Sequence, residues 1–132
     1  MSNHAARTPD AKCAGPGEYV FDLGQINHIK NGPDCAPGEG STVEADRMIV
    51  TLMRLPAGTG AAAHAQPNEQ WIYVLEGTCK AKIGDEEFVA TPGSVVHVPS
   101  NAIHSAEATP DADVVFFTVK DTSQGFPHPD QA

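Results

Sequence analysis

The chain has 132 residues, which is the length of a single domain. It carries 17 acidic and 8 basic residues, for a formal net charge of −9. This negative charge repels phosphate backbones and anionic lipid surfaces, so we expect no nucleic-acid partner and no membrane partner. With 12 Gly and 11 Pro, the composition favours a turn-rich β protein over a helical bundle.

The sequence shows no targeting segment and no cysteine framework. The first residues lack the apolar run of a secretory signal, and no stretch reaches the roughly 20 apolar residues of a membrane helix. Cys13, Cys35 and Cys79 are odd in number, widely spaced and without a C-x-x-C pair. Because this pattern disfavours a disulfide or zinc framework, we expect free thiols in a cytoplasmic protein.

Composition divides the chain into three predicted parts: a flexible N-terminal segment (1–17), a β domain (18–120) and a C-terminal tail (121–132). Within the β domain, the apolar run at residues 19–23 predicts a first strand. Residues 27–45 contain Gly-Pro and Pro-Gly pairs and predict a long loop.

From residue 47 onward, strand-sized segments follow one another, separated by Gly and Pro turns. In residues 78–83, polar and apolar residues alternate, as in a strand with one solvent-exposed face. Cys79, Ala81 and Ile83 lie on the other face. No segment has a sustained helical apolar period. The predicted strands span residues 47–55, 69–75, 78–83, 87–90, 95–98, 105–108 and 114–119. An antiparallel sandwich or barrel is therefore the predicted fold.

Two histidines and two glutamines form the candidate site. His64 and Gln66 are two residues apart and would share one face of a strand, while a hairpin can fold Gln70 back toward them. His104 follows a Pro-Ser-Asn turn at the start of another strand. A barrel would gather these side chains at its mouth, where imidazole nitrogens and amide oxygens suit Fe, Mn, Ni or Zn. The competing interpretation is that the histidines are simply hydrogen-bonded near turns.

The spacing of these residues resembles the two motifs of the cupin family. The segment Gly58-x5-His64-x-Gln66-x3-Gln70-x6-Gly77 resembles the first motif, Gly-x5-His-x-His-x3-Glu-x6-Gly. The segment Gly93-x5-Pro99-x-Asn101-x2-His104 resembles the second, Gly-x5-Pro-x-Gly-x2-His-x3-Asn. The phrase WIYVLEG is also typical of small bacterial cupins. The resemblance covers residues 44–120 and implies an all-β fold, the cupin-type antiparallel β-barrel (double-stranded β-helix or jelly roll).

The resemblance also implies a divalent metal ion inside the open end of the barrel, held by His64, Gln66, Gln70 and His104. Gln70 stands where the family has Glu, and Gln66 stands where it has a second His. A donor set with no carboxylate leaves the charge of the ion to be met by water, hydroxide or an anionic substrate. A degraded site that holds no metal is the alternative.

His97 is a further candidate, either as a general base lining the pocket or, as we favour, as an ordinary outward-facing strand residue. Trp71 and Tyr73 share the face opposite Gln70, so we expect them to pack against another sheet or a second subunit. The remaining histidines fall in the predicted tails and long loop and are interpreted as solvated surface residues.

The leading functional prediction is a metal-dependent enzyme in which the ion polarises an oxygen-rich small molecule, for example an organic acid, in an isomerase, ring-opening or lyase reaction. One alternative is a cupin dioxygenase acting on an enol or diketone, a class that usually retains three histidines. The other is a non-catalytic module that binds or senses a small ligand. We expect a homodimer, with the apolar run at residues 19–23 covering a sheet edge of the partner.

Overall fold

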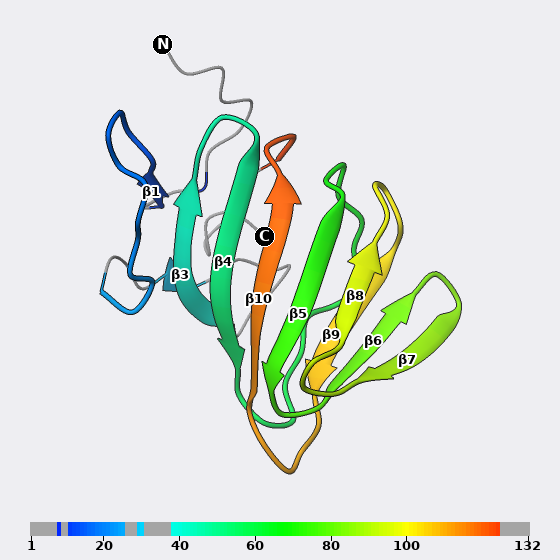
Figure 1. Ribbon diagram of the computed structural model, residues 1–132. Coiled ribbons are helices and arrows are strands. Elements are labelled where there is room, and N and C mark those ends of the chain that lie inside the picture. Colours follow the sequence, from blue (N-terminus) through cyan, green and yellow to red (C-terminus); the bar gives the residue numbers. More distant parts are fainter. Residues whose placement is uncertain (1–7, 9–10, 26–28, 31–37, 125–132) are drawn as a thin grey trace.

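The computed structural model of the chain describes residues 8, 11–25, 29–30 and 38–124. These residues form strands joined by turns and bends, and none of them lies in a helix (Figure 1). No helix that could cross a membrane is found in this part of the chain. The strands are β1 (Lys12–Cys13), β2 (Ile29–Lys30), β3 (Glu39–Glu44), β4 (Met48–Leu55), β5 (Gln70–Glu76), β6 (Cys79–Ile83), β7 (Glu86–Ala90), β8 (Val95–Val98), β9 (His104–Ala108) and β10 (Val114–Asp121).

The strands form two sheets. The larger follows the order β1-β3-β4-β10-β5-β8, with β2 added on β3, and the smaller follows the order β7-β6-β9. Only the β1–β3 pair is parallel among these described pairings. Buried apolar residues from both sheets, including Ile49, Val74, Cys79 and Ala108, belong to one core cluster. The predicted antiparallel, jelly-roll type of all-β fold is therefore confirmed.

Two predictions for the N-terminal half are wrong. The apolar run 19–23 forms no strand, and Tyr19 and Val20 are 87% and 94% exposed. The predicted loop 27–45 contains β3, whose Thr42 and Val43 pair with Thr51 and Val50 of β4. Pairing with a neighbouring strand therefore outweighs the Gly and Pro content that indicated a loop, because strand formation depends mainly on cross-strand packing.

The described part of residues 1–17, which we expected to be flexible, lies against the larger sheet. Thr8 and Ala11 are buried, and β1 pairs with Val43 and Glu44 at the end of β3. The backbone N–H of Thr8 also donates a hydrogen bond to Oε1 of Glu44. These contacts cover the edge strand of the larger sheet, which would otherwise present unpaired backbone groups. The boundaries of the three predicted parts stay a prediction.

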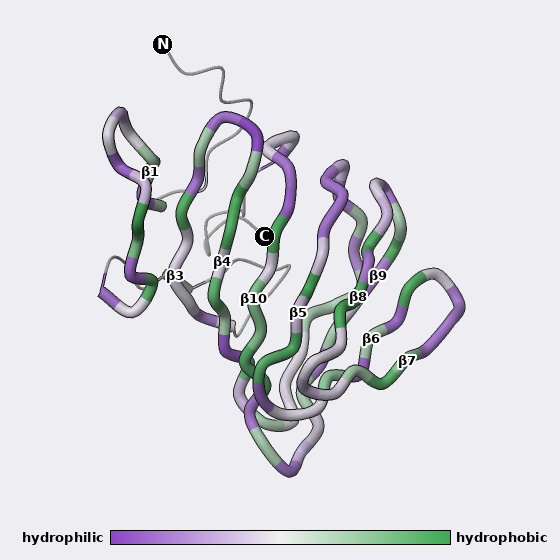
Figure 2. The backbone as a smooth tube through the Cα atoms, in the orientation of Figure 1, coloured by the Kyte–Doolittle hydropathy of each residue, from purple (hydrophilic) through white to green (hydrophobic). Residues whose placement is uncertain are grey.

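The register of the larger sheet decides which side chains face the interior. Figure 2 shows hydrophobic residues recurring along β4, β5 and β10, while the hairpin tips are mainly hydrophilic. Cross-strand partners share a face of the sheet, so each row of partners points the same way. One interior row consists of Thr42, Thr51, Thr118, Ile72 and Val96, and the next consists of Glu44, Ile49, Lys120, Gln70 and Val98.

The threonine row contains two hydroxyl groups that bond to each other and one that is unsatisfied. Oγ1 of Thr42 and Oγ1 of Thr51 lie 3.0 Å apart and share a hydrogen bond. The hydroxyl of Thr118 is equally buried, but it has no hydrogen-bond partner among the residues that the structure describes. Because a buried hydroxyl without a partner has lost its bonds to water, Thr118 is a weak point of this interior row.

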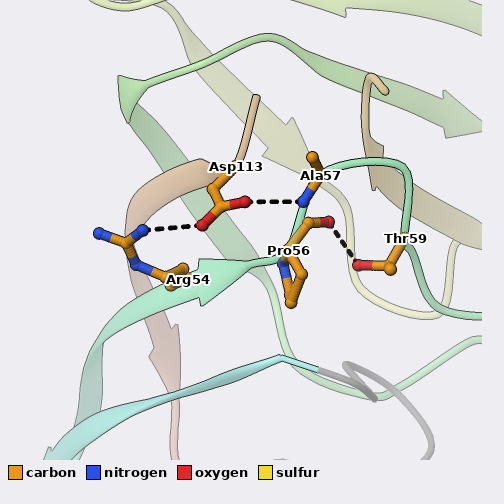
Figure 3. A network of polar contacts seen from close by, with 5 residues as sticks. All are labelled: Arg54, Pro56, Ala57, Thr59 and Asp113. Atoms are coloured by element: carbon orange, nitrogen blue, oxygen red, sulfur yellow. Dashed lines mark hydrogen bonds and ion pairs between the residues drawn. The ribbon is translucent and has the colours of Figure 1, made fainter. Parts of the chain in front are cut away.

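An ion pair and a turn fix the start of the long β4–β5 connection (Figure 3). The carboxylate of Asp113 accepts one hydrogen bond from the backbone N–H of Ala57 and another from Arg54, both at 2.8 Å. The hydroxyl of Thr59 donates to the carbonyl of Pro56 at 2.6 Å. Between them, Gly58 adopts a φ of 73°, which favours glycine. The chain therefore leaves β4 in a defined direction toward residues 60–69.

We predict opposite outcomes for valine at two positions of the threonine row. Thr118→Val should leave the free energy of unfolding unchanged or raise it by about 1 kcal/mol, because it removes an unsatisfied buried hydroxyl. Thr51→Val should lower it by about 1 kcal/mol, because Thr42 loses this hydrogen bond. Urea unfolding of the two variants and the parent protein measures both changes. Destabilisation by Thr118→Val as large as that of Thr51→Val would show that the Thr118 hydroxyl is bonded.

A second prediction concerns the pH dependence of stability. The hydrogen bonds from Ala57 and Arg54 hold the pKa of Asp113 below its usual value. Its stabilising contribution is therefore present above the unfolded-state pKa of about 3.9 and is lost as the pH falls through the lower folded-state value. Asp113→Ala should lower the Tm at pH 7, and the difference from the parent protein should shrink below about pH 4.

The matched control for this measurement is Asp85→Ala, which removes an exposed carboxylate from the β6–β7 turn. Thermal unfolding at a series of pH values should show little effect of this control at any pH. An Asp113→Ala variant whose Tm deficit stays constant down to pH 3 would contradict the prediction.

Candidate functional site

The structure brings His64 and His104 into direct contact. His104 is the first residue of β9, and His64 lies in the connection between β4 and β5. Their backbones exchange two hydrogen bonds, one from each N–H to the other residue's carbonyl, at 3.0 and 2.8 Å. The two imidazole rings have centroids 4.3 Å apart and are tilted by 54°. The predicted meeting of the two histidines at one place in the fold is observed.

The same backbone contact orients each imidazole ring. Nδ1 of His64 lies 3.1 Å from the carbonyl oxygen of Ala62, and Nδ1 of His104 lies 2.9 Å from that of Ala102. A carbonyl oxygen only accepts hydrogen bonds, so Nδ1 carries the proton in both rings. In the neutral imidazole the lone pair is then on Nε2, the atom that binds a metal in rings held in this way.

The two glutamines form a second contacting pair. Gln66 and Gln70 are both buried, and Nε2 of Gln66 donates a hydrogen bond of 2.8 Å to Oε1 of Gln70. Gln66 follows His64 by two residues, and its carbonyl accepts a 2.8 Å bond from the backbone N–H of Asn101. The segment that carries His64 and Gln66 is thus fixed to the turn that leads into His104.

Further bonds fix this segment. The side-chain amide of Asn68 donates to the carbonyls of Asp121 at 2.6 Å and Gln124 at 2.8 Å. Two residues later, Gln70 begins β5. The hydroxyl of Ser100 donates to the carbonyl of Pro67 at 2.5 Å. Asn101 has a φ of 65°, a left-handed conformation that asparagine tolerates better than most residues. Its position corresponds to a glycine of the second motif, so the substitution keeps the turn.

The donor chemistry of the four residues fits a divalent metal ion. The two imidazole rings are in contact, with centroids 4.3 Å apart, so both could contribute to one site. An amide oxygen has two lone pairs, so Oε1 of Gln70 can accept the bond from Gln66 and still donate a pair to a metal. Among the described residues, no cluster of three or more His, Cys, Asp and Glu side chains forms a metal site. A site here therefore depends on the glutamines.

Sequence analysis missed the charged residues beside this site. Lys120 and Glu44 lie in the same interior row as Gln70 and are both almost completely buried. The signal was present, because Val114, Phe116 and Thr118 alternate toward the interior and Lys120 continues the alternation. The predicted strand ended at residue 119, one position too early to include it.

His97 lies away from the two pairs. It is the cross-strand partner of Trp71, on the face of the larger sheet opposite Gln70. Its Nε2 lies 2.6 Å from a carboxylate oxygen of Glu69, and its ring centroid lies 4.4 Å from that of Trp71. The structure therefore does not bring this catalytic candidate together with His64 and His104. Trp71 and Tyr73 are on the predicted face and are exposed, and their packing against a second subunit stays a prediction.

The described cysteines, Cys13 and Cys79, are free thiols, whereas Cys35 lies outside the described residues. Burial raises the pKa of Cys79 to about 11, so this side chain remains protonated at neutral pH. Cys79 packs within the buried apolar core cluster, so we assign it a structural role.

Comparisons with known proteins all point to one family. The family model described as a cupin domain matches residues 51–120, and no curated protein sequence matches the chain. The polyketide cyclase RemF from Streptomyces resistomycificus is similar in structure, with a TM-score of 0.70, 19% identity and 79% of each chain covered. An RmlC-like cupin from Shewanella frigidimarina has a TM-score of 0.69 and 18% identity, over 80% of this chain and 92% of that one.

KdgF from a Halomonas species is a third similar structure, with a TM-score of 0.68 and 16% identity, covering 79% of this chain and 93% of that protein. Identities this low show a shared fold and leave the reaction open. The matched family model covers more than half of the chain and includes all four candidate ligands. Together with the two-sheet fold and the paired histidines, this match shows that the chain belongs to the cupin family.

Proposed function

We propose that this cupin is a metal-dependent enzyme that acts on a small, oxygen-rich molecule by isomerisation, ring opening or a lyase reaction. His64, His104, Gln66 and Gln70 would hold the metal, which we expect to be Fe, Mn, Ni or Zn. The observation that carries the proposal is the matched orientation of the two imidazoles, each with Nδ1 at a backbone carbonyl, so that the lone pair of each neutral ring is on Nε2.

A bound divalent ion supplies Lewis-acid chemistry, which polarises a substrate oxygen and stabilises an enolate or similar oxyanion. The protein holds the imidazole and amide side chains in fixed positions. The carbonyls of Ala62 and Ala102 prevent the imidazoles from rotating, and the bond between the glutamine side chains fixes both amides. Gln66, Gln70 and His104 are buried and His64 is half-buried, and burial strengthens electrostatic interactions within the site.

One observation favours a second candidate, a binding or sensor module without catalysis. One hydrogen bond already joins the side-chain amides of Gln66 and Gln70, so this contact exists without any ion. A cupin that recognises a small ligand through such amides needs no Lewis acid. Turnover of enols, uronates or diketones by the metal-loaded protein under anaerobic conditions would favour the enzyme, and ligand binding without turnover would favour the sensor.

We predict specific effects of substitutions on metal affinity. Protein purified without a chelating tag should bind about one equivalent of Mn²⁺ or Zn²⁺, and His104→Ala should weaken binding on the order of 100-fold, because an imidazole ligand is lost. Gln66→His should strengthen binding about tenfold or more, because imidazole is a better donor than an amide oxygen. Isothermal titration calorimetry and elemental analysis measure both effects.

His97→Ala is the matched control, because it removes an imidazole from the opposite face of the sheet and should leave the metal affinity unchanged. Less than about a tenth of an equivalent of any transition metal, in purified and in metal-titrated protein, would contradict the proposed function. A Gln66→His variant with the parental affinity would place the side chain of residue 66 outside the set of ligands.

A further inference from the structure

The two candidate glutamines lie at the ends of a short bent segment. Gln66 and Gln70 are four residues apart, and the backbone bends at Pro67 and Asn68 between them. In an extended chain their Cα atoms would be roughly 13 Å apart, and the bend reduces this separation. The 2.8 Å hydrogen bond between the two side-chain amides therefore depends on the path of residues 66–70.

The side chain of Asn68 anchors this segment at its bend. Asn68 is completely buried, and its Nδ2 atom donates to the carbonyl oxygens of Asp121 at 2.6 Å and of Gln124 at 2.8 Å. The same Nδ2 atom lies 3.5 Å from Oδ1 of Asp121. The Oδ1 atom of Asn68 has no hydrogen-bond partner in the described part of the chain. The N–H groups of the amide therefore join the bend to the C-terminal end of β10.

The carboxylate of Asp121 adds a second connection to the same end of β10. Its Oδ2 atom accepts a 2.8 Å hydrogen bond from the backbone N–H of Glu69, and its Oδ1 atom accepts one of 2.8 Å from the backbone N–H of Ser123. Two consecutive residues of the bent segment, Asn68 and Glu69, are thus bonded to Asp121. A movement of the segment would break these bonds together.

The first half of the segment is bonded to a different part of the chain. The backbone N–H of Asn101 donates to the carbonyl of Gln66 at 2.8 Å, and the hydroxyl of Ser100 donates to the carbonyl of Pro67 at 2.5 Å. Asn101 and Ser100 belong to the turn that leads into His104. The bend is therefore fixed from two sides, by this turn and by the end of β10.

These bonds have a consequence for metal affinity. A metal ion binds tightly only when its donor atoms are already held in the right geometry, and the residues that orient the ligands contribute strongly to affinity. Loss of the Asn68 bonds would allow Gln66 and Gln70 to move relative to each other. Conversely, an ion bound to both amides would hold the bend in place and so stabilise its bonds to β10.

We propose that Asn68 is a positioning residue of the candidate metal site, and that through it metal binding and the C-terminal end of β10 stabilise each other. The inference rests on the proposed function, because it requires Gln66 and Gln70 to bind the ion. Asn68 acts through the two glutamines and not as a ligand. The site thereby extends to residues 121–124, which are far from His64 in the sequence.

The first test measures Zn²⁺ affinity by calorimetry at pH 7. Asn68→Ala should weaken binding about tenfold or more, as is typical when a residue that orients metal ligands is lost. The matched control is Thr51→Val, which loses a buried hydrogen bond between β3 and β4 and should keep the parental affinity. The visible absorption of bound Co²⁺ depends on the ligand geometry, so it should change in Asn68→Ala and not in Thr51→Val.

The second test measures hydrogen exchange of backbone N–H groups by NMR. Zn²⁺ should slow exchange at Glu69 and Ser123 by about the factor by which Asn68→Ala weakens Zn²⁺ binding, because coupling between two sites is reciprocal. In Asn68→Ala this protection should disappear. The N–H of Gly93, which donates to the carbonyl of Val74 in another turn, should exchange at the same rate with and without Zn²⁺.

The outcomes separate this inference from the proposed function. Parental Zn²⁺ affinity in Asn68→Ala, or equal exchange at Glu69 and Ser123 with and without Zn²⁺, overturns the inference and leaves the proposed function intact. An equal loss of affinity in Asn68→Ala and Thr51→Val has the same meaning, because the loss would then follow from lower stability. If Asn68→Ala does not fold, exchange in the parent protein decides. Failure of the parent protein to bind Zn²⁺ overturns both proposals.

Discussion

The antiparallel pairing of β10 with both β4 and β5 is the constraint on which the rest of the structure depends. Because β10 lies between these strands, its register fixes which of their residues share the interior face. The apolar partners on this face build the core, and the polar partners at the end of the ladder form the row that contains Gln70 and Lys120. A shift of one residue would turn the whole row outward.

The site itself depends on a second kind of contact, between the β4–β5 connection and strand β9. Residues 60–69 run along β9 and exchange hydrogen bonds with it at His64 and His104, while Asn68 joins them to the end of β10. These backbone bonds place two imidazoles in contact and turn both Nδ1 atoms toward carbonyl oxygens. The polar side chains of the site are therefore held by the same hydrogen bonds that satisfy the buried backbone.

The sequence indicated much of this arrangement, and its errors have physical reasons. Seven predicted strands from residue 47 onward lie within two residues of observed strands, since alternation and Gly-Pro turns are local signals. The strand β3 was missed because its stability comes from pairing with β4, which its own composition does not reveal. The run at residues 19–23 misled for the opposite reason, because its apolar residues have no partner strand among those described.

The sequence by itself determined the all-β fold and, through its two spaced motifs, the cupin family, and it predicted four candidate metal ligands. Motif spacing carries this information because a barrel turns at fixed intervals along the chain. Only the tertiary structure decided that the two amides bond to each other, that His97 faces away from Gln70, and that Lys120 is buried beside Gln70. These facts depend on the register between strands far apart in sequence, which no local pattern of residues specifies.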